Sequence, residues 1–129
     1  QNRRPIPAEL GSVPAAARYR EWLSDADFDL TLLGIGEDGH TASLFPGHAW
    51  DGAEVIAVHD APKPPPERVS LSASRLSRSR RVWFIVTGAD KCEAVTRWKK
   101  GAPLPAASVK GWMETVVWLD EIAQSKVLL

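Results

Sequence analysis

The chain is poor in cysteine, has no excess of either charge and contains no long apolar run. Its single cysteine, Cys92, excludes an internal disulfide and is typical of a reducing compartment. The 16 basic and 16 acidic residues cancel, which argues against nucleic acid, because phosphate backbones are bound through clustered lysine and arginine. No stretch approaches the roughly 20 apolar residues that span a bilayer, and we find no secretory signal. We therefore expect a cytoplasmic protein that binds neither nucleic acid nor membranes.

What the chain does contain is the composition of a globular domain. Hydrophobic residues make up 44% and charged residues 25% of the 129 positions, and this length suits one domain or a piece of a larger one. Because the sequence starts at Gln1 rather than at a methionine, we expect residues 1–129 to form a single partial domain, with 1–12 irregular. The basic run 75–81 lies between two expected strands, and we interpret it as a solvated turn.

Apolar runs bounded by glycine, proline and aspartate predict strands, and helical spacing predicts the segments between them. The expected strands are 28–35, 54–59, 68–72, 81–87 and 116–119, and the expected helices are 14–23, 73–77, 88–100 and 120–126, with a short helical turn at 41–44. Ser12 is the expected N-cap of the first helix, and 28–35 is expected to be a buried strand. Strands alternating with helices indicate an α/β fold, an open and mostly parallel Rossmann-like sheet with flanking helices.

The loop after the 28–35 strand combines carboxylates, an imidazole and hydroxyls. Gly34 and Gly36 let the backbone approach a ligand closely, and ligands of open α/β sheets bind at the carboxyl ends of the strands. His40 can take a proton from water near neutral pH, and the neighbouring carboxylate of Asp38 can orient the imidazole and stabilise its charge. The alternative is an ordinary Asp-Gly turn followed by a histidine that caps a helix. On chemical grounds alone both interpretations stay open.

A second candidate site, Thr87–Lys91, lies where the 81–87 strand opens into a helix. Free N–H groups and the helix dipole favour an anion there, and Lys91 adds a full positive charge. The alternative is a plain strand-to-helix turn with an exposed lysine. Arg68 is either a further anion contact or a surface charge beside a strand. We expect no metal, because the histidines lack the HExxH and Cys/His ligand spacings.

Five ordered segments carry a family resemblance. They are GEDGHTASLFPGH (36–48), PKPPPERVSLS (62–72), VWFIVTGADK (82–91), LPAASV (104–109) and VVWLDEIA (116–123). Together they resemble the carboxyl-terminal half of 6-phosphogluconolactonases. Glucosamine-6-phosphate deaminases share the fold and a related loop, but their histidine is generally followed by Ile-Ala-Phe-Asn-Glu-Pro, where this chain has Thr-Ala-Ser-Leu-Phe-Pro. The missing glutamate favours the lactonase.

This resemblance implies hydrolysis of 6-phosphoglucono-δ-lactone to 6-phosphogluconate in the oxidative pentose phosphate pathway, without a metal or organic cofactor. It implies that His40 deprotonates the attacking water and that Asp38 shapes the surroundings of His40. The residues that it implies bind substrate or phosphate are Arg68, Lys91, Gly34, Gly36, Gly39 and Thr41.

The resemblance also implies that the family's amino-terminal half lies outside this sequence. A sheet cut in half exposes strand edges, which tend to pair with another chain. We therefore expect the chain to pair with the missing half or with another copy. Two other functions stay open: a glucosamine-6-phosphate deaminase-like enzyme, and an inactive fragment that binds sugar phosphate.

Overall fold

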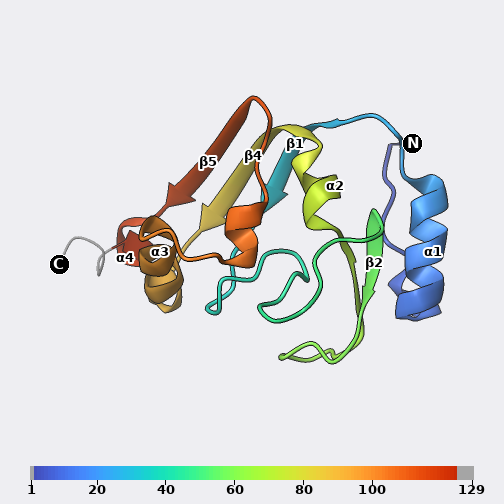
Figure 1. Cartoon of the computed structure of the whole chain (residues 1–129), viewed down its shortest axis with the longest axis horizontal. Coiled ribbons are helices and arrows are strands. Elements are labelled where there is room, and N and C mark those ends of the chain that lie inside the picture. Colours follow the sequence, from blue (N-terminus) through green and yellow to red (C-terminus); the bar gives the residue numbers. More distant parts are fainter. Residues whose placement is uncertain (1, 125–129) are drawn as a thin grey trace.

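A three-stranded parallel sheet is the centre of the molecule, which we describe from a computed structural model over residues 2–124. Its strands lie in the order β1 (Phe28–Leu33), β4 (Ser79–Val86) and β5 (Glu114–Leu119) (Figure 1). Parallel strands with helical crossovers confirm the expected open α/β sheet.

A smaller antiparallel pair lies beside this sheet. It consists of β2 (Val55–Val58) and β3 (Arg68–Leu71), and helix α1 (Ser12–Trp22) packs on both strands (Figure 1). A 3-10 turn, η1 (Ala8–Leu10), precedes α1. Ser12 does not cap α1, contrary to expectation, because the helix already begins at Ser12 and its hydroxyl donates to Glu67.

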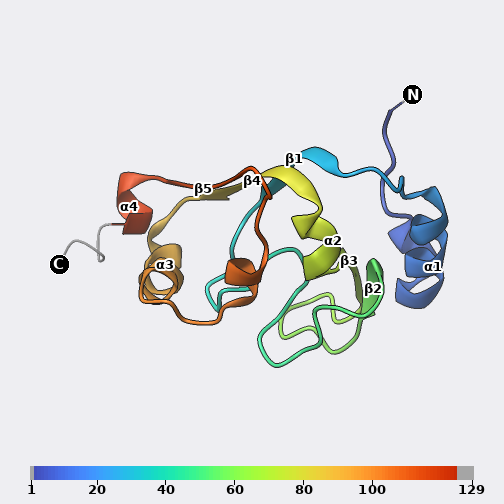
Figure 2. The same ribbon diagram turned by 45° about the horizontal axis from the view of Figure 1, so that its top comes forward.

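The helical elements that follow the strands gather on one face of the parallel sheet. They are α2 (Ala73–Ser77), η2 (Ala89–Lys91), α3 (Cys92–Lys99), η3 (Pro105–Ser108) and α4 (Glu121–Gln124). Figure 2 shows α2, α3 and η3 beneath the sheet, while no helix or strand of residues 2–124 covers the opposite face. The expected helix 120–126 is described only as α4, because 125–126 lie outside the described residues. The expected helical turn at 41–44 is instead closed by an isolated bridge between Thr41 and Leu44.

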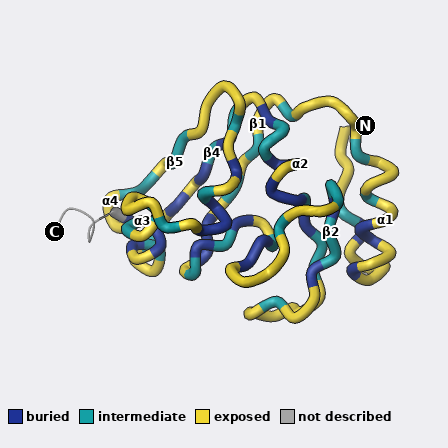
Figure 3. The backbone as a smooth tube through the Cα atoms, in the orientation of Figure 1, coloured by how far each residue is buried: buried dark blue, intermediate teal, exposed yellow. Residues whose placement is uncertain are grey.

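The hydrophobic core lies between β4 and the helical layer. Val82, Phe84 and Val86 of β4 are buried toward that layer, and the ring of Phe84 meets Trp98 of α3 edge-on at 4.8 Å. Figure 3 shows buried stretches of backbone along β4. The expectation that the 28–35 strand is buried is wrong for β1. Its leucines at 30 and 32 are 42% and 61% exposed, because they point to the uncovered face.

The sequence suggested that the basic run 75–81 is a solvated turn, and the structure shows that this interpretation is wrong. Arg75 is buried, and its Nη2 donates to the carbonyl oxygens of Ser24 and Ala26, both at 3.0 Å. Arg78 forms ion pairs that include Asp27 at 3.1 Å and Glu54 at 3.0 Å. The run therefore joins α2 to the segment that leads into β1.

No helix among the described residues is long and apolar enough to cross a membrane.

Candidate active site

The loop that follows β1 folds back on itself at the carboxyl end of the sheet. The backbone N–H of Gly36 donates to the carbonyl of His40 at 2.8 Å, and that of Gly39 donates to the carbonyl of Gly36 at 3.0 Å. The hydroxyl of the buried Thr41 donates to the carbonyl of Gly34 at 2.7 Å. These bonds hold His40 at the strand end, the place where open α/β sheets bind ligands.

Asp38 and His40 form the ionisable pair that the sequence suggested. Oδ1 of Asp38 accepts from the backbone N–H of His40 at 3.0 Å and lies 2.6 Å from its ring Nδ1. Since a carboxylate can only accept, we assign the proton to Nδ1, which leaves the lone pair on Nε2. Burial raises the pKa of Asp38, but the hydrogen bonds from His40 and its charge outweigh burial and lower that pKa below its usual value. The pair can therefore present an oriented proton acceptor.

Two of the three loop glycines have a steric reason to be glycine. A Cβ at Gly36 would lie 2.0 Å from the His40 ring, so the imidazole rests directly against that backbone. Gly39 has φ of +91°, and a Cβ there would lie 2.7 Å from Leu104, while its carbonyl accepts from Ala106 at 3.1 Å. At Gly34 a Cβ would meet nothing within 4 Å.

Phe45 links the imidazole to Arg68, and the sequence interpretation missed it. Its buried ring lies 4.6 Å from that of His40, and the Arg68 guanidinium lies 5.2 Å from its centre. Arg68 also donates to the carbonyls of Lys63, Pro64 and Pro65, which fixes the proline loop. The large aromatic side chain of Phe45, in a loop of mostly small and polar residues, was the signal that could have revealed this role.

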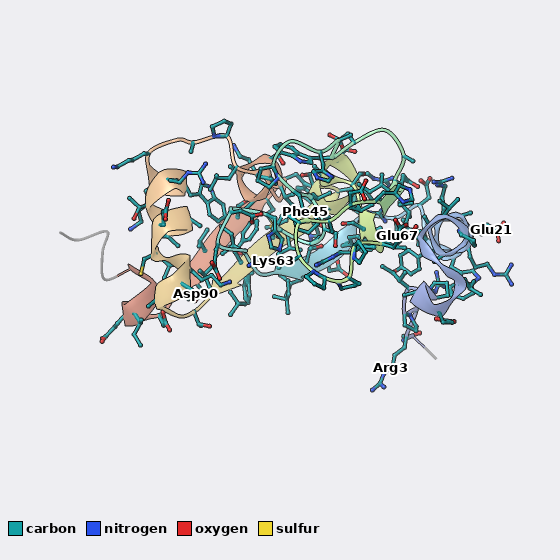
Figure 4. The ribbon with its side chains drawn as sticks, turned by 90° about the horizontal axis from the view of Figure 1, so that it is seen from below. Arg3, Glu21, Phe45, Lys63, Glu67 and Asp90 are labelled. Carbon is teal, nitrogen blue, oxygen red and sulfur yellow. The ribbon has the colours of Figure 1, made fainter. Side chains whose placement is uncertain are left out.

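Lys63 is a second residue that the sequence interpretation missed. Its Nζ lies 3.7 Å from Oε1 of Glu37, so the proline loop reaches the His40 loop. Both side chains are more than half exposed, so this ion pair contributes little to stability. Figure 4 looks at this side of the molecule and shows Phe45, Lys63 and Asp90 spread across it.

Lys91 stands in the neighbouring turn, after β4. Its Nζ lies 3.4 Å from Asp90 Oδ2, and among residues 2–124 no hydrogen bond or ion pair joins it to the His40 loop. The turn is held by Asp120, whose carboxylate accepts from the backbone N–H of Gly88 at 3.1 Å and of Ala123 at 2.6 Å. The structure thus brings Arg68 to His40 through Phe45, while Lys91 occupies the next strand end.

A hollow of about 250 Å³ opens at the loop. It is lined by Gly34, Ile35, Gly36, His40, Thr41 and Ala42. A larger open hollow, beside Arg3 and Trp22, contains no histidine. The hollow at His40 is smaller than the roughly 300 to 1,000 Å³ typical of small-molecule pockets. Within the described part of the chain, no group of three or more His, Cys, Asp or Glu residues could hold a metal ion.

The fold places the chain among open α/β proteins that gather ligands at their strand ends. Comparison with known proteins narrows this class. The family described as glucosamine-6-phosphate isomerases/6-phosphogluconolactonase matches residues 2–118, and the chain belongs to this family.

Several similar proteins are 6-phosphogluconolactonases. That of Mycobacterium leprae is 43% identical over 108 residues, covering 78% of this chain and 43% of the relative. That of Streptomyces coelicolor is 40% identical over 129 residues, covering 88% and 49%. The crystal structure of the Thermotoga maritima enzyme matches with a TM-score of 0.79 at 31% identity, covering 88% of this chain and 54% of that one. The chain therefore spans about half the length of the curated relatives that it matches.

Proposed function

We propose that the chain is part of a 6-phosphogluconolactonase, which hydrolyses 6-phospho-D-glucono-1,5-lactone to 6-phosphogluconate in the oxidative pentose phosphate pathway. The observation that carries the proposal is the contact of 2.6 Å between Asp38 and His40, in a chain 43% identical to a protein of that name. We propose that no cofactor takes part, with His40 rather than a metal ion activating the water. We also propose a cytoplasmic location, consistent with the single, buried Cys92.

In the proposed mechanism, Nε2 of His40 removes a proton from water as the water oxygen bonds to the lactone carbonyl carbon. The bond from that carbon to the ring oxygen then breaks, and the imidazolium returns its proton to the departing oxygen. Asp38 acts through His40: its carboxylate holds the ring orientation and stabilises the transient positive charge.

Arg68 and Lys91 are the proposed contacts for the phosphate and the developing oxyanion. Arg68 uses Nε and Nη2 to hold the proline loop, which leaves Nη1 for an anion. Gly34, Gly36 and Gly39 supply close backbone approach, and Thr41, whose hydroxyl donates to Gly34, contributes to substrate binding by closing the loop.

We further propose that the site needs another polypeptide segment to be complete. The hollow at His40 is small and open, and its described lining offers one ionisable side chain, His40. The segment would be either the part of the relatives that the match leaves out or another copy of this chain.

The test is lactone hydrolysis by the chain alone and by the chain co-expressed with the unmatched remainder of the Streptomyces coelicolor lactonase. We expect His40→Ala to lower kcat at least about a hundredfold, because general base catalysis contributes that much or more. His59→Ala is the matched control, since His59 lies in an exposed pair with Glu67 away from the loop.

Full activity of a folded His40→Ala protein would refute the base assignment. Release of ammonia from glucosamine 6-phosphate, without lactone hydrolysis, would replace the lactonase by a deaminase.

A further inference from the structure

The proline loop (residues 61–67) connects β2 to β3, and its shape is held by backbone atoms and by one arginine. The backbone N–H of Ala61 donates to the carbonyl of Pro66 at 3.0 Å and closes the loop. Nη2 of Arg68 donates to the backbone carbonyl of Lys63 at 2.9 Å. None of these hydrogen bonds uses the side chain of Lys63, so the loop presents that ammonium group without depending on it.

Lys63 pairs with Glu37 of the His40 loop, and the geometry of this pair is weak. Nζ of Lys63 lies 3.7 Å from Oε1 of Glu37, beyond the roughly 2.7 to 3.2 Å of a good hydrogen bond. The two side chains are 55% and 56% exposed, and pairs this exposed contribute little because water solvates both charges. An anion that offers Lys63 shorter, charge-assisted hydrogen bonds can therefore replace Glu37 at little cost.

The position of Lys63 relative to the hollow at His40 indicates which part of a substrate it can reach. The hollow is lined by residues 34–36 and 40–42, and neither Lys63 nor Glu37 belongs to this lining. The reacting carbonyl has to enter the hollow, because His40 must reach the water that attacks it. Lys63 contacts residue 37, just beyond the lining, so it is placed for a group of the substrate remote from the reacting carbon.

The charges around Lys63 favour a phosphate as that group. In the view of Figure 4, Lys63 lies between Phe45 and Asp90. Phe45 has the Arg68 guanidinium 5.2 Å from its ring centre, and Asp90 pairs with Lys91 at 3.4 Å. Lys63 thus lies between the residues that the other two proposed phosphate contacts touch. A phosphate monoester carries about 1.5 to 2 negative charges near pH 7, more than one cation can neutralise.

We propose that Lys63 binds the phosphate of the substrate and that Glu37 competes with this phosphate for the lysine. The inference rests on the proposed function, because the lactone supplies the phosphate. A phosphate displaces the single carboxylate, since it carries more charge and offers three acceptor oxygens. A sugar lactone without phosphate offers nothing in exchange and leaves the ion pair intact. Glu37 and Lys63 together therefore make the site selective for phosphorylated lactones.

The test is the binding of 6-phosphogluconate, measured by isothermal titration calorimetry on the complex with the Streptomyces coelicolor remainder described above. Lys63→Met should raise the dissociation constant, and KM for the lactone in parallel, at least about fivefold, with kcat within about twofold of wild type. Lys63→Arg keeps the charge and should restore most of the binding. Lys110→Met is the matched control, since Lys110 is exposed and precedes the amino end of β5, at the opposite edge of the sheet. It should leave the dissociation constant unchanged.

Removal of the competing carboxylate should have the opposite effect. Glu37→Gln should lower the dissociation constant about two- to fivefold, the range expected for release from an exposed ion pair. In the Lys63→Met background the same substitution should have much less effect, because Glu37 competes only for that lysine. A general repulsion of phosphate by Glu37 would instead act equally in both backgrounds. The variants should keep the wild-type circular dichroism spectrum, since neither side chain holds the proline loop.

Equal dissociation constants in Lys63→Met and Lys110→Met would overturn the phosphate role of Lys63, and so would a wild-type complex that does not bind 6-phosphogluconate. A lower kcat at an unchanged dissociation constant would assign Lys63 to the reacting carbonyl instead. Unchanged binding in Glu37→Gln, or an equal gain in both backgrounds, would refute the competition. Binding that depends on Lys63 without lactone hydrolysis would refute the reaction and keep this inference, whereas hydrolysis with an unchanged KM in Lys63→Met would do the reverse.

Discussion

Two charged clusters lie at opposite ends of β1, and they differ in their access to solvent. At the amino end, Arg75 has a fully buried side chain, and its guanidinium lies 4.1 Å from the ring centre of Phe28. At the carboxyl end, the side chains of His40 and Asp38 are 19% and 37% exposed. Both clusters hold a loop against the same strand. Of the two clusters, only the one at the carboxyl end has a ring nitrogen, Nε2 of His40, available to a ligand at an open hollow.

The comparison teaches that an unusual charge environment does not by itself mark a reactive site. Burial lowers the pKa of Arg75, as does the charge of Arg78, while nearby carboxylates such as Glu54 raise it. Nε and Nη1 of Arg75 have no hydrogen-bond partner among residues 2–124, yet they are buried, so no substrate can reach them. Perturbed groups are functional candidates only where a ligand can approach them.

Arg75→Ala should produce the largest change in stability at the amino-end cluster. It removes two charge-assisted hydrogen bonds to backbone carbonyls and the packing of a fully buried side chain, while Glu54 keeps its pair with Arg78, so we expect a loss of about 3 kcal/mol in the free energy of unfolding. Urea unfolding followed by circular dichroism measures it. Arg18→Ala removes an exposed pair with Glu21 and should cost less than about 1 kcal/mol. Equal losses in the two variants would contradict the structural role of Arg75.

The sequence predicted one of these two clusters and not the other. The loop at His40 could be predicted because its glycines, carboxylate and imidazole are neighbours in the chain. The burial of Arg75 could not, because its partners Ser24 and Ala26 stand about fifty positions away and contribute only carbonyl oxygens. The sequence of a basic run is the same whether its side chains face solvent or pack against a segment that is distant in the chain.

The same limit explains the error at β1. In β4, large apolar residues lie on both faces, and the inward set, Val82, Phe84 and Val86, is buried. In β1, Leu30 and Leu32 predict burial equally well, but the layer that would cover them is not formed by residues 2–124. The hydrophobicity of a strand indicates that one of its faces is suited to burial. Only the structure shows whether the described residues cover that face.

Gly36→Ala should lower turnover at the carboxyl-end cluster strongly while lowering the stability of the fold only modestly. The added Cβ would overlap the His40 ring at 2.0 Å, and a displacement of about 1 Å can cost about a hundredfold in turnover. Gly101→Ala is the control, because its φ of +82° strains the new residue and lowers stability far from the loop, without any clash with a side chain. We expect similar unfolding midpoints for the two variants but loss of lactone hydrolysis in Gly36→Ala alone. Comparable turnover in both variants would mean that the ring position does not matter.

The smallest expected effect is the pH dependence of stability at Asp38. Its pKa is lower in the folded chain than the usual 3.8, so ionised Asp38 stabilises the fold above about pH 4 and loses this contribution as the pH falls through the folded-state pKa. Because the carboxylate is 37% exposed, solvent screening keeps the contribution below about 1 kcal/mol. Asp38→Asn should thus be less stable than wild type at pH 7, and the difference should shrink by pH 3 in urea unfolding. A difference in stability that stays constant over this pH range would mean that Asp38 acts through its shape alone. The charge of Asp38 would then contribute nothing to the stability of the fold.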